Sequence, residues 1–280
     1  MNLHYLEEID STNKYAKEHI KELSDKTVVY TYNQTNGRGR LNRKWSNLGE
    51  DNIYASIVLK PSGQMQEVYS NLTQYLCVVL AQTFEEYGVI PNIKWPNDIQ
   101  INSKKISGIL AEGVNEGTKL SGLVLGFGIN LNTKIEKISQ INQPATSLNI
   151  ETGKNIDKEI FLTKLLDKFC LMYDKFIKEG FLLIKNDYIR RANFLNKEIT
   201  VKVMEINGKW FYKSPEAKTI DLMAAFFEKP LDGEADLTLR LFAPPASGEN
   251  DLSIEDGLMN SYTEIKKLPN IRIRFEPVEL

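Results

Sequence analysis

The sequence predicts an α+β fold in which helices pack on one antiparallel or mixed sheet, with a small second α+β domain after it. Short stretches rich in β-branched and aromatic residues recur between residues 27 and 131, and they predict the strands of the sheet. Two longer stretches, with apolar residues three or four positions apart, predict its main helices. Beyond Asn196 the texture of the sequence changes, so we place the domains at residues 1–195 and 196–280, with the boundary near Leu195.

The predicted elements of the first domain run helix, strand, strand, helix, hairpin, strand and two helices. Their ranges are Lys14–Ile20, Thr27–Tyr32, Asn52–Lys60, Met65–Tyr87, the hairpin of Ile99–Ile101 with Lys105–Glu112, Leu120–Leu131, Asp157–Glu179 and Phe181–Asn193. The apolar side of the helix Asp157–Glu179 is predicted to hold Ile160, Phe161, Leu165, Phe169, Met172, Tyr173 and Phe176. Glycine interrupts the strand Leu120–Leu131 at Gly122, Gly126 and Gly128, and glycine inside a strand often marks a close approach by backbone or ligand.

The second domain opens with a hairpin signal. Glu198–Met204 and Lys209–Lys213 flank Asn207-Gly208, a pair that favours a tight turn between strands. The remaining predicted elements are a helix over Glu216–Glu228 and strands over Ala235–Phe242 and Ile271–Phe275.

The composition is that of a soluble globular protein of 280 residues with a formal net charge of −2. This charge argues against a general nucleic-acid binder, whose domains usually carry a strong basic excess. No apolar run reaches membrane-spanning length, and the first residues form neither a signal peptide nor a lipidation motif, so a cytoplasmic location is expected. Cys77 and Cys170 lie in helix-like apolar stretches without metal-binding spacing, so burial is their expected role.

A cationic glycine loop, defined as residues 34–45, is the most unusual stretch of the chain. It holds four cations within seven residues and two glycines: Arg38, Arg40, Arg43 and Lys44, with Gly37 and Gly39. Neither a Walker loop nor the dinucleotide fingerprint is present. On charge alone, three interpretations stay open, which are a solvated hairpin tip, a nucleic-acid contact and a site for a small phosphorylated ligand.

Four further motifs accompany this loop. They are Ser11-Thr12-Asn13, Lys94-Trp95-Pro96-Asn97-Asp98, Lys105-Ile106-Ser107-Gly108-Ile109-Leu110-Ala111-Glu112 and Gly126-Phe127-Gly128-Ile129-Asn130. Together with the loop, and in this order, they make the sequence resemble the biotin–protein ligase family over about residues 3 to 200. The resemblance implies a class II aminoacyl-tRNA synthetase/biotin ligase-like catalytic domain.

The resemblance also implies an ATP-dependent reaction in two steps. Biotin and ATP form biotinyl-5′-adenylate and pyrophosphate, with Mg²⁺ accompanying the nucleotide, and the biotinyl group then passes to a lysine of a biotin carrier domain. A carboxylate that attacks an α-phosphate brings two anions together, so the site must supply positive charge. Because the adenylate would hydrolyse in water, a lid must cover it, and by analogy with the family the cationic glycine loop is that lid.

Roles for individual residues follow from the same resemblance. The implied catalytic residues are Lys105, Arg38 and Arg40, with Lys105 bridging the biotin carboxylate and the α-phosphate. The implied biotin-binding residues are Ser11, Thr12, Asn13, Gln34, Gly37, Arg38, Gly39, Arg40, Lys105 and Gly108. The implied nucleotide-binding residues are Arg40, Arg43, Trp45, Asn97, Asp98 and Asn130, and no metal ligand is assigned. For Asp98, a structural turn, a metal contact and anchoring of the loop all stay open.

Two features depart from the family pattern. Asn42 stands where the family's loop has its third glycine, although asparagine tolerates positive φ better than most residues. The second domain lacks the pattern of the family's SH3-like cap, so none of the cap's roles is assigned here. Because the chain begins almost at the catalytic domain, a stand-alone ligase without a DNA-binding domain is expected.

Alternatives to this function stay open. A lipoate–protein ligase is one, although its Arg-Arg-x-Ser-Gly-Gly-Gly signature is absent. A nucleic-acid-binding protein with a basic loop and an inactive relative that binds biotin are the others. The expected partner is the biotin carrier domain of a biotin-dependent carboxylase, with no nucleic acid and no membrane. The acceptor's identity, a homodimer and the role of residues 205–280 are left open.

Overall fold

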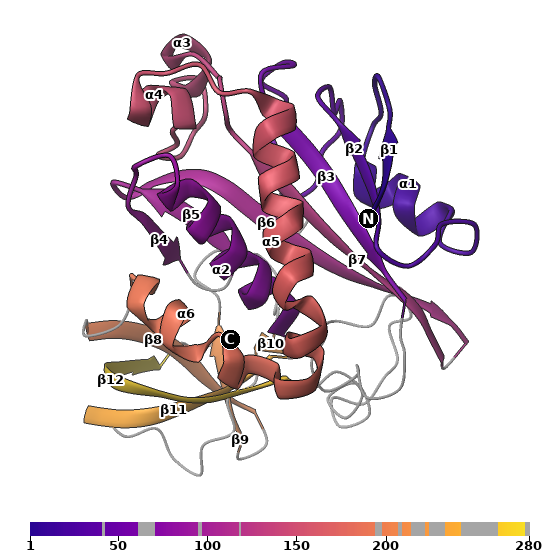
Figure 1. Ribbon diagram of the computed structural model, residues 1–280. Coiled ribbons are helices and arrows are strands. Elements are labelled where there is room, and N and C mark those ends of the chain that lie inside the picture. Colours follow the sequence, from indigo (N-terminus) through magenta and orange to yellow (C-terminus); the bar gives the residue numbers. More distant parts are fainter. Residues whose placement is uncertain are drawn as a thin grey trace. The chain divides into compact units, whose positions relative to one another are not determined.

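The computed structural model in Figure 1 describes residues 1–40, 43–60, 71–94, 97–117 and 119–193. Beyond them it describes the backbone of five strands, 198–206, 209–213, 222–223, 233–241 and 263–277. The chain divides into two units, Met1–Asn193 and Phe194–Leu280, and each is described separately below.

A seven-stranded mixed sheet forms the centre of the first unit. Its strands are β1 (Asn2–Tyr5), β2 (Thr27–Thr31), β3 (Ile53–Leu59), β4 (Pro91–Lys94), β5 (Asp98–Ile101), β6 (Lys104–Glu116) and β7 (Lys119–Ile129). Their order in the sheet is β1-β2-β3-β7-β6-β5-β4. Only the pairing of β1 with β2 is parallel among these strands, and the other pairs are antiparallel. The α+β class and the hairpin of β5 and β6 predicted from the sequence are therefore confirmed.

The helices of the first unit contact different parts of this sheet. They are α1 (Thr12–Glu18), α2 (Leu72–Glu85), α3 (Ile135–Ile138), α4 (Leu148–Thr152), α5 (Lys158–Glu179), the 3₁₀ turn η4 (Gly180–Leu183) and α6 (Lys185–Arg191). Figure 1 shows α2 and α5 side by side across the sheet, and α2 also contacts β4, β5 and β6. Helix α1 instead contacts β2, β3 and β7. The predicted start of α2 near Met65 lies outside the described residues, which resume at Asn71.

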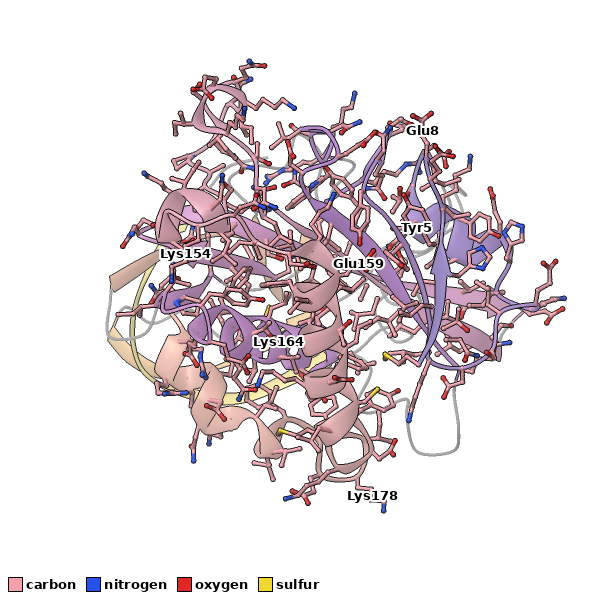
Figure 2. All side chains as sticks on the ribbon, turned by 45° about the horizontal axis from the view of Figure 1, so that its top comes forward. Tyr5, Glu8, Lys154, Glu159, Lys164 and Lys178 are labelled. Carbon is pink, nitrogen blue, oxygen red and sulfur yellow. The ribbon has the colours of Figure 1, made fainter. Side chains whose placement is uncertain are left out.

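Helix α5 shows how far periodicity alone can predict burial. Its start is confirmed, because the Asp157 side chain caps it by accepting a hydrogen bond from the Ile160 N–H. The buried side nevertheless contains Leu162 and Leu166, while Ile160 is 54% exposed, so the predicted apolar side was wrong at Ile160. On the opposite side lie charged residues such as Glu159 and Lys164, as Figure 2 shows.

Strand β7 explains why a groove can form beside α1. Successive side chains of a strand point to opposite faces, so Gly126 and Gly128 share a face with Val124. Val124 packs with Ala16 and Ile20 of the α1 segment. The two glycines present no side chains on this face, so residues from other segments can pack directly against the strand there.

The described strands of the second unit form a five-stranded sheet. They are β8 (Glu198–Ile206), β9 (Lys209–Lys213), β10 (Leu222–Met223), β11 (Gly233–Leu241) and β12 (Thr263–Pro277), in the order β10-β9-β8-β12-β11. The predicted hairpin is confirmed by the antiparallel pairing of β8 with β9. The predicted helix Glu216–Glu228 is wrong at its centre, because Leu222 and Met223 pair with β9. Pairing with a neighbouring strand there overrides a local helical pattern.

Arg191 links α6 to α2 and supports a testable prediction. Its guanidinium is 3% exposed, donates to both carboxylate oxygens of Glu85 and also donates to Asp187. Arg191→Met should lower the free energy of unfolding by about 2 kcal/mol, measured by urea denaturation, because it removes the arginine that pairs with Glu85 and leaves Asp187 with Arg190 alone. This loss of stability is smaller than that for a fully buried ion pair, because both carboxylates are more than a third exposed and are screened by water. Arg190→Met, which removes one exposed ion pair to Asp187, should change it by under about 0.5 kcal/mol. If Arg191→Met and Arg190→Met lost the same free energy of unfolding, the link between α6 and α2 would not depend on Arg191.

Candidate functional site

The cationic glycine loop is held in place through its backbone. Its first residues are fixed to the segment before α1, because the N–H groups of Thr35 and Asn36 donate to the carbonyls of Ile9 and Asp10 at 2.9 and 2.8 Å. The loop then folds back on itself, with Trp45 N donating to Gly37 O at 2.9 Å. A Cβ atom on Gly37 would lie 2.5 Å from Gln34 Nε2, so a larger residue would displace Gln34.

The Ser-Thr-Asn motif lies at the N-terminus of α1. Ser11 is its N-cap, and the Ser11 hydroxyl accepts a hydrogen bond from Lys14 N at 3.4 Å. Thr12 turns inward, and both its N–H and its hydroxyl lie within reach of Gln34 Oε1, at 2.9 and 3.2 Å. Thr12 and Gln34 are both buried, so their remaining polar atoms must be matched by any ligand that enters.

Asn13 is bound entirely within the protein. Its Nδ2 donates to the Leu110 carbonyl at 3.2 Å and to Glu112 Oε2 at 2.8 Å, and its Oδ1 accepts from the Ser56 hydroxyl at 2.6 Å. A Cβ atom on Gly126 would lie only 1.8 Å from that Oδ1, so Asn13 occupies the space that the glycine leaves.

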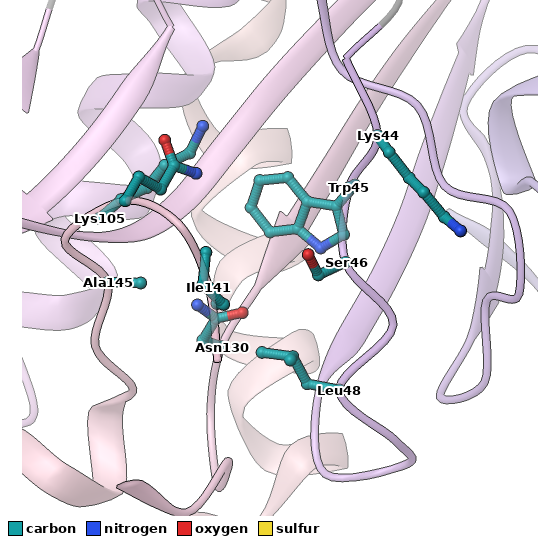
Figure 3. Close-up of a pocket in the computed structure, with 9 residues that line it drawn as sticks. Lys44, Trp45, Ser46, Leu48, Lys105, Asn130, Ile141 and Ala145 are labelled. Atoms are coloured by element: carbon teal, nitrogen blue, oxygen red, sulfur yellow. The ribbon is translucent and has the colours of Figure 1, made fainter. Parts of the chain in front are cut away.

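Lys105 and Trp45 form the other end of the site. The Lys105 ammonium lies 2.8 Å from Asp98 Oδ1 and 5.1 Å from the centre of the Trp45 ring, and the Lys105 and Asp98 side chains are 18% and 20% exposed. The indole rests on two paired glycines, since Cβ atoms on Gly108 and Gly128 would lie 2.7 and 2.6 Å from ring carbons. Figure 3 shows this ring in a pocket with Lys105 and Asn130, while Lys44 points away from it.

The pocket beside Trp45 is bounded by a segment that the sequence analysis did not single out. Its lining residues are Lys44, Trp45, Ser46, Leu48, Lys105, Asn130, Ile141, Gln143 and Ala145. Asn130 is fixed there, because its N–H donates to Ile106 O and its Nδ2 donates to Thr146 O at 3.0 Å. Ile141, Gln143 and Ala145 lie outside any strand or long helix, so no periodicity could have indicated them.

The arginines of the loop are not gathered at Lys105. Arg40 donates to Asn97 Oδ1 at 3.4 Å, and Asn97 is itself bound to the backbone of Ile109. Arg38 and Arg43 are exposed. The pKa of the Asp10 carboxyl is lowered, mainly by the hydrogen bond from Lys14. The positive charge of Arg38 acts on this pKa in the same direction, so Arg38 lies close to Asp10.

Trp45 lies between the two parts of the site. A Cβ atom on Gly37 would touch both Gln34 Nε2 and, at 3.1 Å, Trp45 Cβ, while the Lys105 ammonium lies 5.1 Å from the centre of the Trp45 ring. We call the surface from Thr12 and Gln34, under Trp45, to Lys105 the groove. The sequence analysis missed Ser56, which is buried on β3 and contacts both Thr12 and Asn13. Its only signal was a polar residue within an otherwise apolar strand.

Comparison with known proteins gives concordant matches. Residues 5–130 match the family model described as the biotin/lipoate A/B protein ligase family. The bifunctional ligase/repressor BirA of Bacillus spizizenii is 32% identical over 216 residues, which cover 76% of this chain and 66% of that protein, just under two thirds of its length. The biotin–[acetyl-CoA-carboxylase] ligase of Paracoccus denitrificans is 29% identical over 201 residues, covering 69% of this chain and 82% of that protein. A solved structure of the biotin protein ligase from Aquifex aeolicus in complex with biotin and ATP superposes with a TM-score of 0.64 and 25% identity, over 95% of this chain and 96% of that one.

Proposed function

Because the chain belongs to the biotin/lipoate A/B protein ligase family, with biotin protein ligases among its relatives, we propose that it is an ATP-dependent biotin–protein ligase. The observation that carries this proposal is the groove, in which the buried polar pair of Thr12 and Gln34 and the Lys105 cation lie on either side of Trp45, whose ring rests on glycines of β6 and β7. A site of this kind suits a ligand with a small polar head and an anionic tail.

The polar end of the groove matches the cyclic urea of biotin. Gln34 Oε1 is occupied by Thr12, so the Gln34 Nε2 hydrogens, which have no partner among the described residues, are free to donate to a carbonyl. The Thr12 oxygen in turn can accept from a ring N–H. A urea offers both a carbonyl acceptor and N–H donors, whereas the dithiolane ring of lipoate offers neither, so this end favours biotin.

The cationic end suits the first chemical step. The biotin carboxylate oxygen attacks the α-phosphorus of ATP, a new O–P bond forms, and the bond to pyrophosphate breaks. Lys105 is positioned to stabilise negative charge on both reacting groups, and Asp98 holds its ammonium in place before they arrive. Arg38, Arg40 and Arg43 are proposed to act when the loop closes, since Arg38 and Arg43 lie exposed in this structure. In the second step the acceptor lysine amine attacks the acyl carbon and AMP leaves.

The pocket beside Trp45 is proposed to take the nucleotide. Asn130 lines it, and because its Nδ2 is occupied by the Thr146 carbonyl, its Oδ1 is the atom left to accept a hydrogen bond from an adenine amino group. Asn97 and Asp98 are proposed to lie near the same nucleotide, because Asn97 accepts a hydrogen bond from Arg40 and Asp98 forms an ion pair with Lys105.

Magnesium is proposed only as the ion that accompanies ATP. The described residues bring no three His, Cys, Asp or Glu side chains together, so they do not fit a metal held by the protein alone. Mg²⁺ in nucleotide sites is generally bound by substrate phosphates with one or two carboxylates. No protein ligand is assigned to it.

The partner is proposed to be a biotin carrier domain of a biotin-dependent carboxylase. The cytoplasmic location and the absence of nucleic-acid binding stay predictions, and a homodimer stays open. None of the helices in the described ranges is long and apolar enough to cross a membrane.

The function can be tested with one assay. The full chain is incubated with ATP, Mg²⁺, biotin and a biotin carrier domain, and the acceptor is analysed by mass spectrometry. We expect a biotinyl adduct on one lysine, only when ATP is present, and no lipoyl adduct when lipoate replaces biotin. An unmodified acceptor, or a lipoyl adduct alone, would reject the proposal.

A further inference from the structure

A chain of hydrogen bonds connects the buried polar end of the groove to an ion pair at the surface. Lys17 on α1 lies 2.5 Å from Glu112 Oε1 on β6, and these side chains are 33% and 29% exposed. The other oxygen of Glu112 accepts from Asn13 Nδ2 at 2.8 Å. Asn13 Oδ1 then meets the Ser56 hydroxyl, which lies 2.8 Å from Thr12 Oγ1.

The chemistry of these groups fixes the direction of every hydrogen bond. A carboxylate can only accept, so Glu112 forces the NH₂ side of the Asn13 amide toward itself and the oxygen toward Ser56. An amide oxygen also only accepts, so the single hydrogen of Ser56 goes to Asn13 and not to Thr12. The Thr12 hydrogen is then directed to Ser56, because the two hydroxyl oxygens lie 2.8 Å apart and only Thr12 has a hydrogen left to place between them, so Thr12 Oγ1 keeps its lone pairs free.

A reversed Asn13 amide would have the opposite effect. Its NH₂ group would donate to Ser56, the Ser56 hydrogen would turn to Thr12, and one of the two lone pairs of the Thr12 oxygen would be taken up. The hydrogen bond from Asn13 to the Leu110 carbonyl opposes this reversal too, but at 3.2 Å it is longer than the bond to the charged Glu112.

We propose that Glu112, supported by Lys17, is a positioning residue for biotin selectivity: through Asn13 and Ser56 it keeps the Thr12 hydroxyl oxygen ready to accept a ureido N–H. This rests on the proposed function, because it assumes that the cyclic urea binds at Thr12 and Gln34. Glu112 itself touches no substrate, since its two oxygens are occupied by Lys17 and Asn13.

The fold supplies a matched control for this proposal. One helical turn beyond Lys17, Lys21 forms a second ion pair between the α1 segment and β6, to Glu116 at 2.7 Å. That pair is more exposed, at 74% and 66%, and has no connection to Asn13 among the hydrogen bonds of the described residues. A variant that loses the Lys21–Glu116 ion pair therefore measures what an exposed ion pair between the α1 segment and β6 contributes to biotin binding when it is not hydrogen-bonded to Asn13.

The test compares Glu112→Leu, Glu112→Gln and Glu116→Leu in the full chain by calorimetric titration with biotin, ATP and biotin methylated on both ureido nitrogens. Glu112→Leu should raise the Kd for biotin roughly tenfold, because the lost bond is one to a charged group. Its Kd for ATP and its kcat at saturating biotin should stay unchanged. Glu112→Gln keeps an acceptor for Asn13, so its Kd for biotin should stay within about threefold of the parent's. The Kd of Glu116→Leu for biotin should stay within the same range.

The methylated ligand separates positioning from general structural damage. It has no N–H to donate, so its affinity should be nearly equal in the parent and in Glu112→Leu, and the preference for biotin over it should shrink in the variant. An equal loss for both ligands, or equal effects of Glu112→Leu and Glu116→Leu, would overturn the inference while the ligase activity of the parent stood. A parent chain that binds no biotin would instead reject the proposed function, and the inference with it.

Discussion

Lys105→Ala is expected to slow adenylate formation by about 10²–10³-fold, the usual effect of removing one donor that stabilises charge in a transition state. The Lys105 ammonium lies close to the glycines at the base of the groove, because a Cβ atom on Gly108 would lie 3.1 Å from its Nζ. Without it, two anions would approach each other with less compensation. Pyrophosphate release in the presence of biotin and ATP measures this step directly.

A neighbouring lysine controls for loss of charge on the same hairpin. Lys104 precedes Lys105 on β6 and is exposed, so Lys104→Ala should keep the parent rate. Circular dichroism and thermal unfolding should show both variants folded. Unchanged pyrophosphate release by Lys105→Ala would remove Lys105 from the mechanism.

Gly126→Ala is expected to weaken biotin binding by more than about a hundredfold, a loss of over ~2.7 kcal/mol. The new methyl group would lie 1.8 Å from Asn13 Oδ1, so the Asn13 side chain must move away from Ser56 and Glu112. Such a displacement disturbs Thr12 as well, because Ser56 contacts both residues. Calorimetric titration with biotin measures the effect, and overpacking should also cost about 1–3 kcal/mol of stability.

Gly113→Ala is the matched control on the neighbouring strand. The nearest atom to its new methyl group is Leu120 Cδ1 at 3.4 Å, an ordinary contact, so biotin binding should be retained. If Gly126→Ala bound biotin as tightly as Gly113→Ala, the groove above β7 would not be the biotin site.

Trp45 couples the loop to the floor of the groove in this structure. Its indole lies on Gly108 and Gly128 and beside the Lys105 ammonium, so it covers the surface where the proposed ligand would run. The loop is fixed at its base to Ile9 and Asp10, whereas its arginines Arg38 and Arg43 are exposed. Under the proposed function, closure of the loop over an adenylate would require movement of the loop beyond its base, together with the tryptophan.

Local patterns predicted the elements of the first unit well. The start of the helix near Asp157, the hairpin of β5 and β6 and the strand β7 follow from residue types at short spacing, because helix periodicity, turn formation and strand periodicity are local properties. The same reasoning failed at Leu222 and Met223, where a strand partner distant in the sequence decides the conformation. It also misplaced Ile160, because the position of the sheet determines which side of an amphipathic helix is buried.

By itself the sequence determined the order of the motifs, and with it the family, since residue types at fixed spacing are sufficient for that resemblance. Only the tertiary structure decided the partners of each side chain. It placed Asn13 between Ser56 and Glu112, paired Lys105 with Asp98, and left Arg38 on the surface. The physical reason is clearest at Asn13, which lies on a helix and meets Ser56 and Glu112 on two strands, 43 and 99 residues away, because no local pattern specifies partners so distant in the sequence.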